Sequence, residues 1–228
     1  ICTAHRLAGL PAPRDGQTAL LVDGYRRVAQ AVRRQARPLL LPTMRAGVGG
    51  LSVIERAVVL LGWALALRRS EIAALDLVDV VFVGSGAVVT VRFSKTDQAG
   101  REAPRLPLDA VSGDHICPVA ALRAWLAERG VFPGPLFVRS RGRIGGGFVT
   151  DCVRRLVGAA GEDHSGYSGH SLRAGFATQA ALDGVPEWEI RERTRHKSVQ
   201  VLANYIRPAT AMQRGLMGRL LAGKGETR

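Results

Sequence analysis

Apolar positions recur along the chain with two different spacings, and the change between them separates two kinds of predicted element. Most of the chain has apolar residues three or four positions apart, which is the spacing of amphipathic helices. Two runs, Val80–Val83 and Val88–Phe93, are instead rich in β-branched residues and are joined by Gly-Ser-Gly, and Arg105–Leu108 is a third short run. We predict that these three runs form a small antiparallel sheet.

Three helices are predicted before the β runs. A basic helix covers 17–36. Ser52 and Glu55 form a capping box, which predicts the start of a strongly apolar helix that ends near Arg69. A short helix follows over 70–75. After the β runs, the helical spacing predicts six helices, at 118–129, 148–157, 171–182, 186–194, 199–206 and 210–221.

Prolines and glycines interrupt the helical pattern near the beginning of the chain. Pro38 and Pro42 are followed by three glycines, so we predict a hinge over 37–50. At 228 residues the chain is long enough to bury one good core. The predicted fold class is α+β, mainly α, with a helical domain and a small three-stranded antiparallel sheet at one edge.

Charge narrows the class of partner. The chain has 32 Lys and Arg against 19 Asp and Glu, a net charge of +13 and a pI near 11.1, which favours polyanions. The longest apolar run, Val58–Leu67, is half of the about 20 residues that a bilayer crossing needs, so nucleic acid is favoured over a membrane. Three scattered cysteines argue against a disulfide frame or a zinc cluster and suit a reducing cytosol. With nucleic acid as the favoured partner, we expect a cytoplasmic, nucleoid-associated protein. Because the chain opens on Ile1, we expect a fragment or a processed product.

Seven polar residues stand where this scaffold can present them: Arg68, Glu71, Lys95, His170, Arg173, His196 and Tyr205. Each has an ordinary structural explanation, such as helix capping, a solvated charge or, for Tyr205, packing in the core. Together they suit a phosphodiester. Arg68 and Arg173 can each donate paired N–H groups to its nonbridging oxygens, and Glu71 stands in a supporting position at i+3 from Arg68.

The remaining residues suit attack on the phosphorus atom. A tyrosine hydroxyl with a pKa of about 10 is protonated at neutral pH, so Tyr205 needs a proton acceptor. His170 is the candidate base, and Lys95 can protonate the departing oxygen. His196 adds a hydrogen bond to the phosphate. Since the arginines neutralise the charge, the set needs no metal ion.

The order and spacing of these residues resemble the boxes of the tyrosine recombinases, or phage-type integrases. The boxes are Ala66-Leu-Arg68-Arg-Ser-Glu71-Ile, Ser94-Lys95-Thr-Asp, His170-Ser-Leu-Arg173 and Asn204-Tyr205-Ile206, with His196 between the last two. The match covers roughly 50–210, and the segment from Tyr167 onward is Cre-like. Two departures stand out, because Ala66 and Arg195 occupy positions where the family often has glycine.

The resemblance implies a site-specific DNA strand transferase that forms a covalent 3′-phosphotyrosyl intermediate, releases a 5′-hydroxyl and rejoins it to a partner strand without metal, cofactor or ATP. It implies double-stranded DNA as partner and self-association into a tetrameric synapse. It assigns 1–45 to the remnant of an N-terminal core-binding domain and linker, 46–207 to the catalytic domain, and 208–228 to a C-terminal helix and tail. Most of the core-binding domain is missing, so the chain looks truncated.

Two other interpretations stay open. Ala180, Gly184 and Ile190 match the packing pattern of a helix-turn-helix with a basic second helix, which would make the chain a DNA-binding regulator and Tyr205 a core residue. A decayed recombinase would bind DNA without cutting it. The apolar stripe on the predicted helix over 210–221 also has two interpretations, because it can fold back onto its own domain or dock into a neighbouring protomer.

Overall fold

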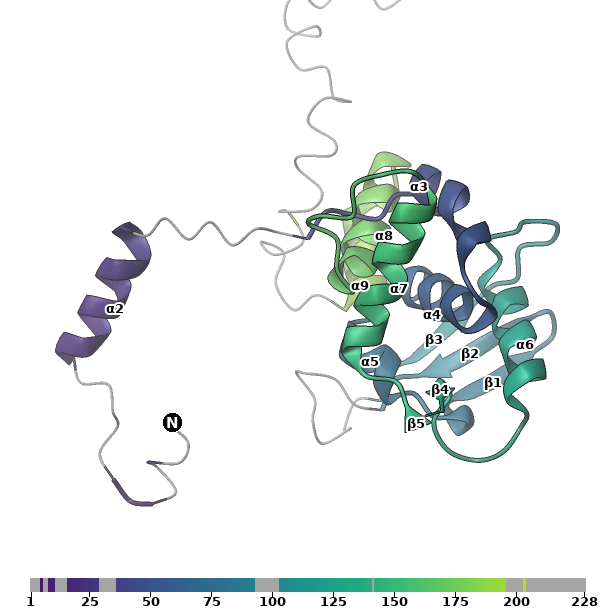
Figure 1. Cartoon of the computed structure of the whole chain (residues 1–228), viewed down its shortest axis with the longest axis horizontal. Helices are drawn as coiled ribbons and strands as arrows, with labels where there is room; N and C mark the ends of the chain where they lie inside the picture. Colours follow the sequence, from purple (N-terminus) through teal and green to yellow (C-terminus); the bar gives the residue numbers. More distant parts are fainter. Residues whose placement is uncertain are drawn as a thin grey trace, which may run out of the picture. The chain divides into compact units, whose positions relative to one another are not determined.

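The computed structural model divides the chain into two units, Ile1–Gln35 and Ala36–Arg228. It describes residues 5, 8–10, 16–28, 36–92, 103–140, 142–195 and 203. The first unit contains α2 (Gly16–Val28). The elements of the second unit are, in order, α3 (Leu41–Gly47), the 3-10 helix η1 (Val48–Gly50), α4 (Val53–Ala64), α5 (Arg69–Ala74), the 3-10 helix η2 (Leu77–Asp79), β1 (Val80–Val83), β2 (Gly86–Thr90), β3 (Arg105–Leu108), α6 (Pro118–Arg129), β4 (Val138–Arg139), β5 (Gly142–Arg143), α7 (Gly146–Ala159), α8 (His170–Leu182) and α9 (Glu187–Thr194) (Figure 1). Within these residues, no helix has the length and apolar character that a membrane crossing needs.

Helix α4 is the centre of the second unit. Residues 57–61 are each at most 2% exposed, and the helix packs against α6, α7 and α8. A helix that is apolar on all sides is buried in a core. The predicted start of this helix is confirmed, since Ser52 is the N-cap and its backbone N–H donates to Glu55 Oε2 at 3.0 Å.

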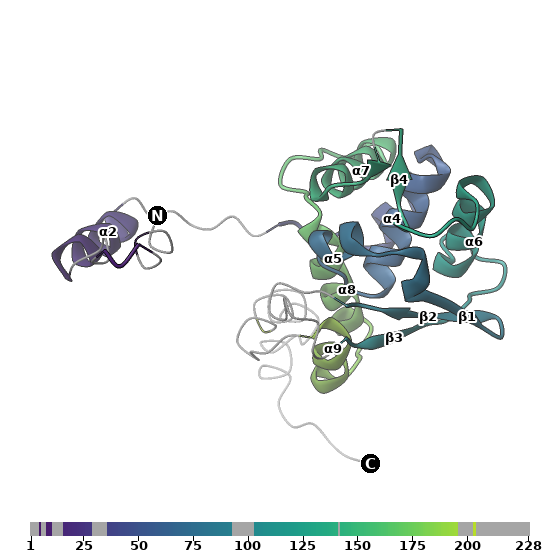
Figure 2. The same ribbon diagram turned by 90° about the horizontal axis from the view of Figure 1, so that it is seen from below.

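The three predicted β runs form one antiparallel sheet in the order β1-β2-β3, which confirms the predicted fold class. Its register pairs Val80 with Val89 and Val89 with Leu106. Side chains alternate between a buried and an exposed face along β3, and the centre of the Phe82 ring on β1 lies 4.2 Å from the guanidinium of Arg123 on α6. Figure 2 shows the sheet at one edge of the helical body, with α4 and α6 on the same side of it.

The predicted hinge over 37–50 is wrong for residues 41–50. Residues 41–50 form α3 and η1, and Pro42 lies in the first turn of α3. Proline is tolerated there because the first N–H groups of a helix have no partner within it. Since α3 packs on α7, these residues belong with the second unit, Ala36–Arg228.

The segment before α3 crosses α8 at close range. Leu39 is fully buried, and its backbone N–H donates to the carbonyl of Ser171 at 3.0 Å. Its own carbonyl accepts from Trp63 Nε1 at 2.9 Å. Gly175 makes the crossing possible, because a Cβ atom there would lie 2.0 Å from the carbonyl oxygen of Leu39.

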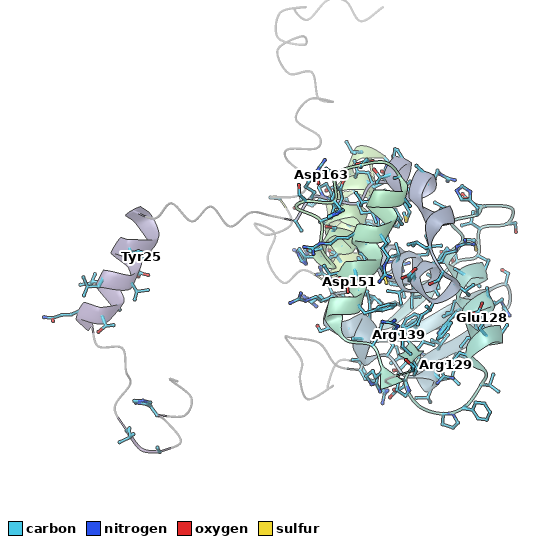
Figure 3. All side chains as sticks on the ribbon, viewed as in Figure 1. Tyr25, Glu128, Arg129, Arg139, Asp151 and Asp163 are labelled. Carbon is cyan, nitrogen blue, oxygen red and sulfur yellow. The ribbon has the colours of Figure 1, made fainter. Side chains whose placement is uncertain are left out.

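Other boundaries differ from the sequence pattern. The apolar helix ends at Ala64, five residues before the predicted end. The hairpin of β4 and β5 was not predicted. Arg139, labelled in Figure 3, lies on β4. Its guanidinium is 4.8 Å from the centre of the Phe148 ring on α7. Helix α2 is described as far as Val28. Residues 29–35 of that predicted helix lie outside the described residues, and Ala36, its predicted last residue, is not helical. The predicted helices at 199–206 and 210–221 also lie outside the described residues, except for Ala203.

Candidate active site

A tight turn at the end of α4 places Arg68. The N–H of Leu67 donates to the carbonyl of Gly62 at 2.9 Å, and the N–H of Ala66 donates to that of Trp63 at 3.0 Å. These two bonds make a Schellman turn, which needs a left-handed residue after the helix. Ala66, with φ of 47°, takes that conformation without being glycine. The turn reverses the chain so that Arg68 becomes the N-cap of α5.

The carboxylate of Glu71 holds this turn through its contacts with Arg68 and Arg195. Its side chain is fully buried. Oε1 lies 2.5 Å from Arg68 Nη1, and Oε2 accepts from the backbone N–H of Arg68 at 2.9 Å. Oε2 also lies 2.7 Å from Nη2 of Arg195 at the end of α9. One buried carboxylate therefore holds both the backbone and the guanidinium of Arg68 and joins them to a second arginine.

Helix α8 brings two further candidates to the turn. Arg173 is 1% exposed, and its Nη1 donates to the carbonyl of Ala66 at 2.9 Å. His170 is the first residue of α8, and its backbone N–H donates to Ser168 Oγ at 3.3 Å. The structure thus brings Arg68, Glu71, His170 and Arg173 together around one turn.

The environment of His170 lowers its pKa. Part of the residue is exposed to solvent, yet the protein packed around the imidazole removes water, and this is the largest cause of the shift. The charges of Arg173, Arg68 and Arg69 act in the same direction. Both effects disfavour the protonated imidazolium. His170 is therefore neutral at pH 7 and able to accept a proton.

Three successive carbonyl groups at the end of α4 each accept from a different arginine. The carbonyl of Ala64 accepts from Arg193 Nε at 3.2 Å, and that of Leu65 from Arg195 Nη1 at 3.4 Å. The next one, on Ala66, is the partner of Arg173. The last carbonyls of a helix have no partner within it and carry partial negative charge, so they suit guanidinium groups.

Arg193 and Arg195 were missed as site residues. Burial lowers the pKa of both guanidinium groups, although arginine stays protonated in proteins. The only signal in the sequence was that Arg195 replaces a glycine common in the family. That signal gave no direction for the side chain, because the contact to Glu71 joins residues 124 positions apart.

Lys95, His196 and Tyr205 lie outside the described residues, so the structure does not place them. The last described residue before Lys95 is Arg92, whose Nη2 lies 2.5 Å from Asp76 Oδ2 and whose Nε lies 2.6 Å from Asp79 Oδ1. These ion pairs hold the side chain of Arg92. Among the described residues, no group of three His, Cys, Asp or Glu side chains could hold a metal ion.

Comparison with known proteins shows the family to which the chain belongs. The model of the phage integrase family matches residues 35–212, so the chain belongs to that family. The integrase/recombinase xerD homolog of Selenomonas ruminantium is 30% identical over 222 residues, which cover 91% of this chain and 64% of the relative. The chain therefore spans less than two thirds of that protein.

Solved structures agree on the fold. XerA recombinase is 20% identical with a TM-score of 0.63, and the match covers 80% of this chain and 64% of that one. XerH site-specific recombinase, solved bound to palindromic difH substrate in a post-cleavage complex, is 16% identical with a TM-score of 0.62, and the match covers 80% and 52%. At such identities the likeness shows the shared fold.

Proposed function

We propose that the chain is the catalytic part of a site-specific DNA recombinase, which cuts and rejoins DNA strands through a 3′-phosphotyrosyl intermediate. The observation that carries the proposal is the convergence on one turn. Arg173 holds the carbonyl of Ala66, two residues before Arg68, and both guanidinium charges act on His170. Converging positive charge beside a neutral imidazole suits the in-line attack of a hydroxyl on a phosphodiester.

In the proposed first step, Tyr205 Oη bonds to the phosphorus atom while its proton passes to His170. The bond from phosphorus to the 5′-oxygen breaks, and Lys95 gives that oxygen a proton. Arg68 and Arg173 stabilise the charge on the nonbridging oxygens, and His196 adds a hydrogen bond. The second step reverses these transfers with a 5′-hydroxyl of a partner strand. Because each step exchanges one phosphoester for another, the reaction needs neither ATP nor a metal ion.

The proposed partner is double-stranded DNA, and the net charge of +13 supports it. We extend the proposal to a tetrameric synapse on two duplexes, with the segment over 208–228 as the link between protomers. Residues 1–45 would be the remnant of a core-binding domain and its linker, and 46–207 the catalytic domain. We place this action on chromosomal or mobile DNA in the cytoplasm, in association with the nucleoid.

Trapping the covalent intermediate tests the proposal. The 228-residue chain would be incubated with nicked duplexes that carry a randomised central segment, because the target sequence is unknown. Cleavage beside a nick releases a short oligonucleotide and leaves the protein attached to DNA. We expect DNA that stays bound to protein in detergent, and none with Tyr205→Phe, whose DNA affinity should equal that of the parent chain. Covalent DNA on the Tyr205→Phe chain would refute the assignment.

A helix-turn-helix regulator is the second candidate, because α8 and α9 do pack as that motif requires. Ala177, Ala181 and Ile190 form a small core between them, and Gly184 has φ of 81° in the turn. The predicted basic second helix is wrong, however. Five residues of α9 are exposed: Glu187, Trp188, Glu189, Arg191 and Glu192. Three of them carry a carboxylate and one carries a guanidinium. Such a surface would repel DNA phosphates, whereas Arg193 is turned inward to Ala64.

A further inference from the structure

Arg195 ends α9 in a conformation that arginine rarely adopts. Its φ and ψ are 54° and 43°, in the left-handed region, and its backbone N–H donates to the carbonyl of Glu192 at 3.1 Å. Glycine takes this conformation without strain, whereas a Cβ atom crowds the neighbouring carbonyl oxygen. An arginine that persists here is held by contacts of its side chain.

Those contacts occupy both ends of the guanidinium. Nη2 lies 2.7 Å from Glu71 Oε2, and Nη1 donates to the carbonyl of Leu65 at 3.4 Å. The side chain is 16% exposed. Because both ends are engaged within the turn, Arg195 does not stand as a direct ligand of a phosphate in the way that Arg68 does.

The charges of the three side chains follow from this arrangement. Glu71 carries one negative charge between two guanidinium groups, so Arg68, Glu71 and Arg195 together keep one positive charge. Without Arg195, the carboxylate would pair with Arg68 alone, and the pair would be neutral. A neutral pair stabilises the negative charge of the five-coordinate phosphorus in the transition state much less than a group with a net positive charge does. The reason is that charges interact strongly in a partly buried site.

We propose that Arg195 is a positioning residue for the strand-transfer reaction, acting through Glu71 on Arg68. It shares the carboxylate, so that the guanidinium of Arg68 keeps its charge for the reacting phosphate. It also fastens the end of α9, immediately before His196, to the turn that carries Arg68. The inference rests on the proposed function.

Three variants separate this role from simple packing. Arg195→Gly removes the side chain and suits the left-handed backbone, so the fold is preserved. Arg195→Lys keeps the charge but loses the two-ended contact. Glu71→Gln combined with Arg195→Gly restores one net positive charge at Arg68. Arg191→Ala, which removes an exposed arginine from the same helix, is the matched control.

The rate of covalent complex formation would be measured at saturating nicked DNA, with DNA affinity and thermal unfolding measured in parallel. We expect Arg195→Gly to lower the rate roughly tenfold to a hundredfold, the loss typical of a misplaced catalytic group, with affinity unchanged. Arg195→Lys should recover part of the rate. The double variant should be faster than Arg195→Gly alone, which a packing role would not produce. Arg191→Ala should cleave at the parent rate.

Amide hydrogen exchange over 65–72 gives a readout that needs no activity. Loss of the Arg195 contacts should speed exchange there in Arg195→Gly and leave it unchanged in Arg191→Ala. Unchanged exchange, a rate within twofold of the parent, or a double variant no faster than Arg195→Gly would each overturn the inference. If the parent chain forms no covalent complex, the proposed function fails, and hydrogen exchange alone decides whether Arg195 holds the turn.

Discussion

Replacing Gly175 by alanine should destabilise the second unit severely. The new Cβ atom would lie 2.0 Å from the carbonyl oxygen of Leu39 and 2.8 Å from its nitrogen and carbonyl carbon, where ordinary contact begins near 3.4 Å. The obstacle is backbone, so no rotamer change relieves it. The segment before α3 must move away from α8, and the bonds of Leu39 to Ser171 and Trp63 are then lost.

The magnitude follows from these losses. Overpacking costs about 1–3 kcal/mol, and the two hydrogen bonds contribute about 1 kcal/mol each. Alanine recovers about 0.5–1 kcal/mol through its better helix propensity. The expected loss is about 3 kcal/mol in the free energy of unfolding, or roughly 6–12 °C in Tm for a unit of this size.

Thermal unfolding followed by circular dichroism would measure the shift, with Gly158→Ala as the matched control. Gly158 lies on α7 and is exposed, and a Cβ atom added there would meet no neighbouring part of the protein within 4 Å. This control should unfold at or slightly above the temperature of the parent chain. If Gly175→Ala unfolds within about 1 °C of the control, the close crossing of Leu39 over α8 is wrong.

Three further predictions concern the proposed chemistry. The rate of covalent complex formation at subsaturating DNA, which reports the free chain, should rise with pH through a pKa below 6.5 and level off by neutrality, because His170 must be unprotonated. For the same reason the contribution of His170 to stability is complete above about 6.5 and is lost as the pH falls below it. Arg173→Ala should slow cleavage by about 10²–10³-fold, as measured by single-turnover kinetics, but weaken DNA affinity in gel shifts much less, since it is aimed at one phosphate among many; equal losses would contradict this division. A chain lacking 209–228 should still bind a half-site as a monomer but lose cooperative binding of a second protomer in native gels, and unchanged cooperativity would mean that the tail folds back on its own domain.

The pattern in the sequence located the elements whose ends have strong local signals. The helix over 118–129 was predicted to the residue, because Pro118 opens it and Gly130 ends it. The strand over 80–83 was also correct, since β-branched residues meet a Gly-Ser-Gly turn there. The end of α4 was missed because an alanine takes the left-handed position after it, so no glycine marks the boundary.

The candidate site shows a similar division. The spacing of three residues within each of the pairs Arg68/Glu71 and His170/Arg173 is a local signal, and the structure brings both pairs to one turn, while their catalytic roles stay predictions. The roles of Arg193 and Arg195 depend on which carbonyl groups the fold brings to them, and no local pattern encodes that choice. The positions of Lys95, His196 and Tyr205 remain predictions.

The hydrogen bonds from Arg173, Arg193 and Arg195 to the end of α4 can form only late in synthesis, because these arginines lie far along the chain from the helix. Their hydrogen bonds join residues 107, 129 and 130 positions apart. At a translation rate of about 5–20 residues per second, the turn is made roughly 5–25 s before the arginines that complete it. During that interval its three carbonyl groups lack the arginine donors that they have in the folded protein. An unfinished chain that ends before Arg173 therefore has the turn without any of these guanidinium groups, and the full set is organised only after Arg195 has been made.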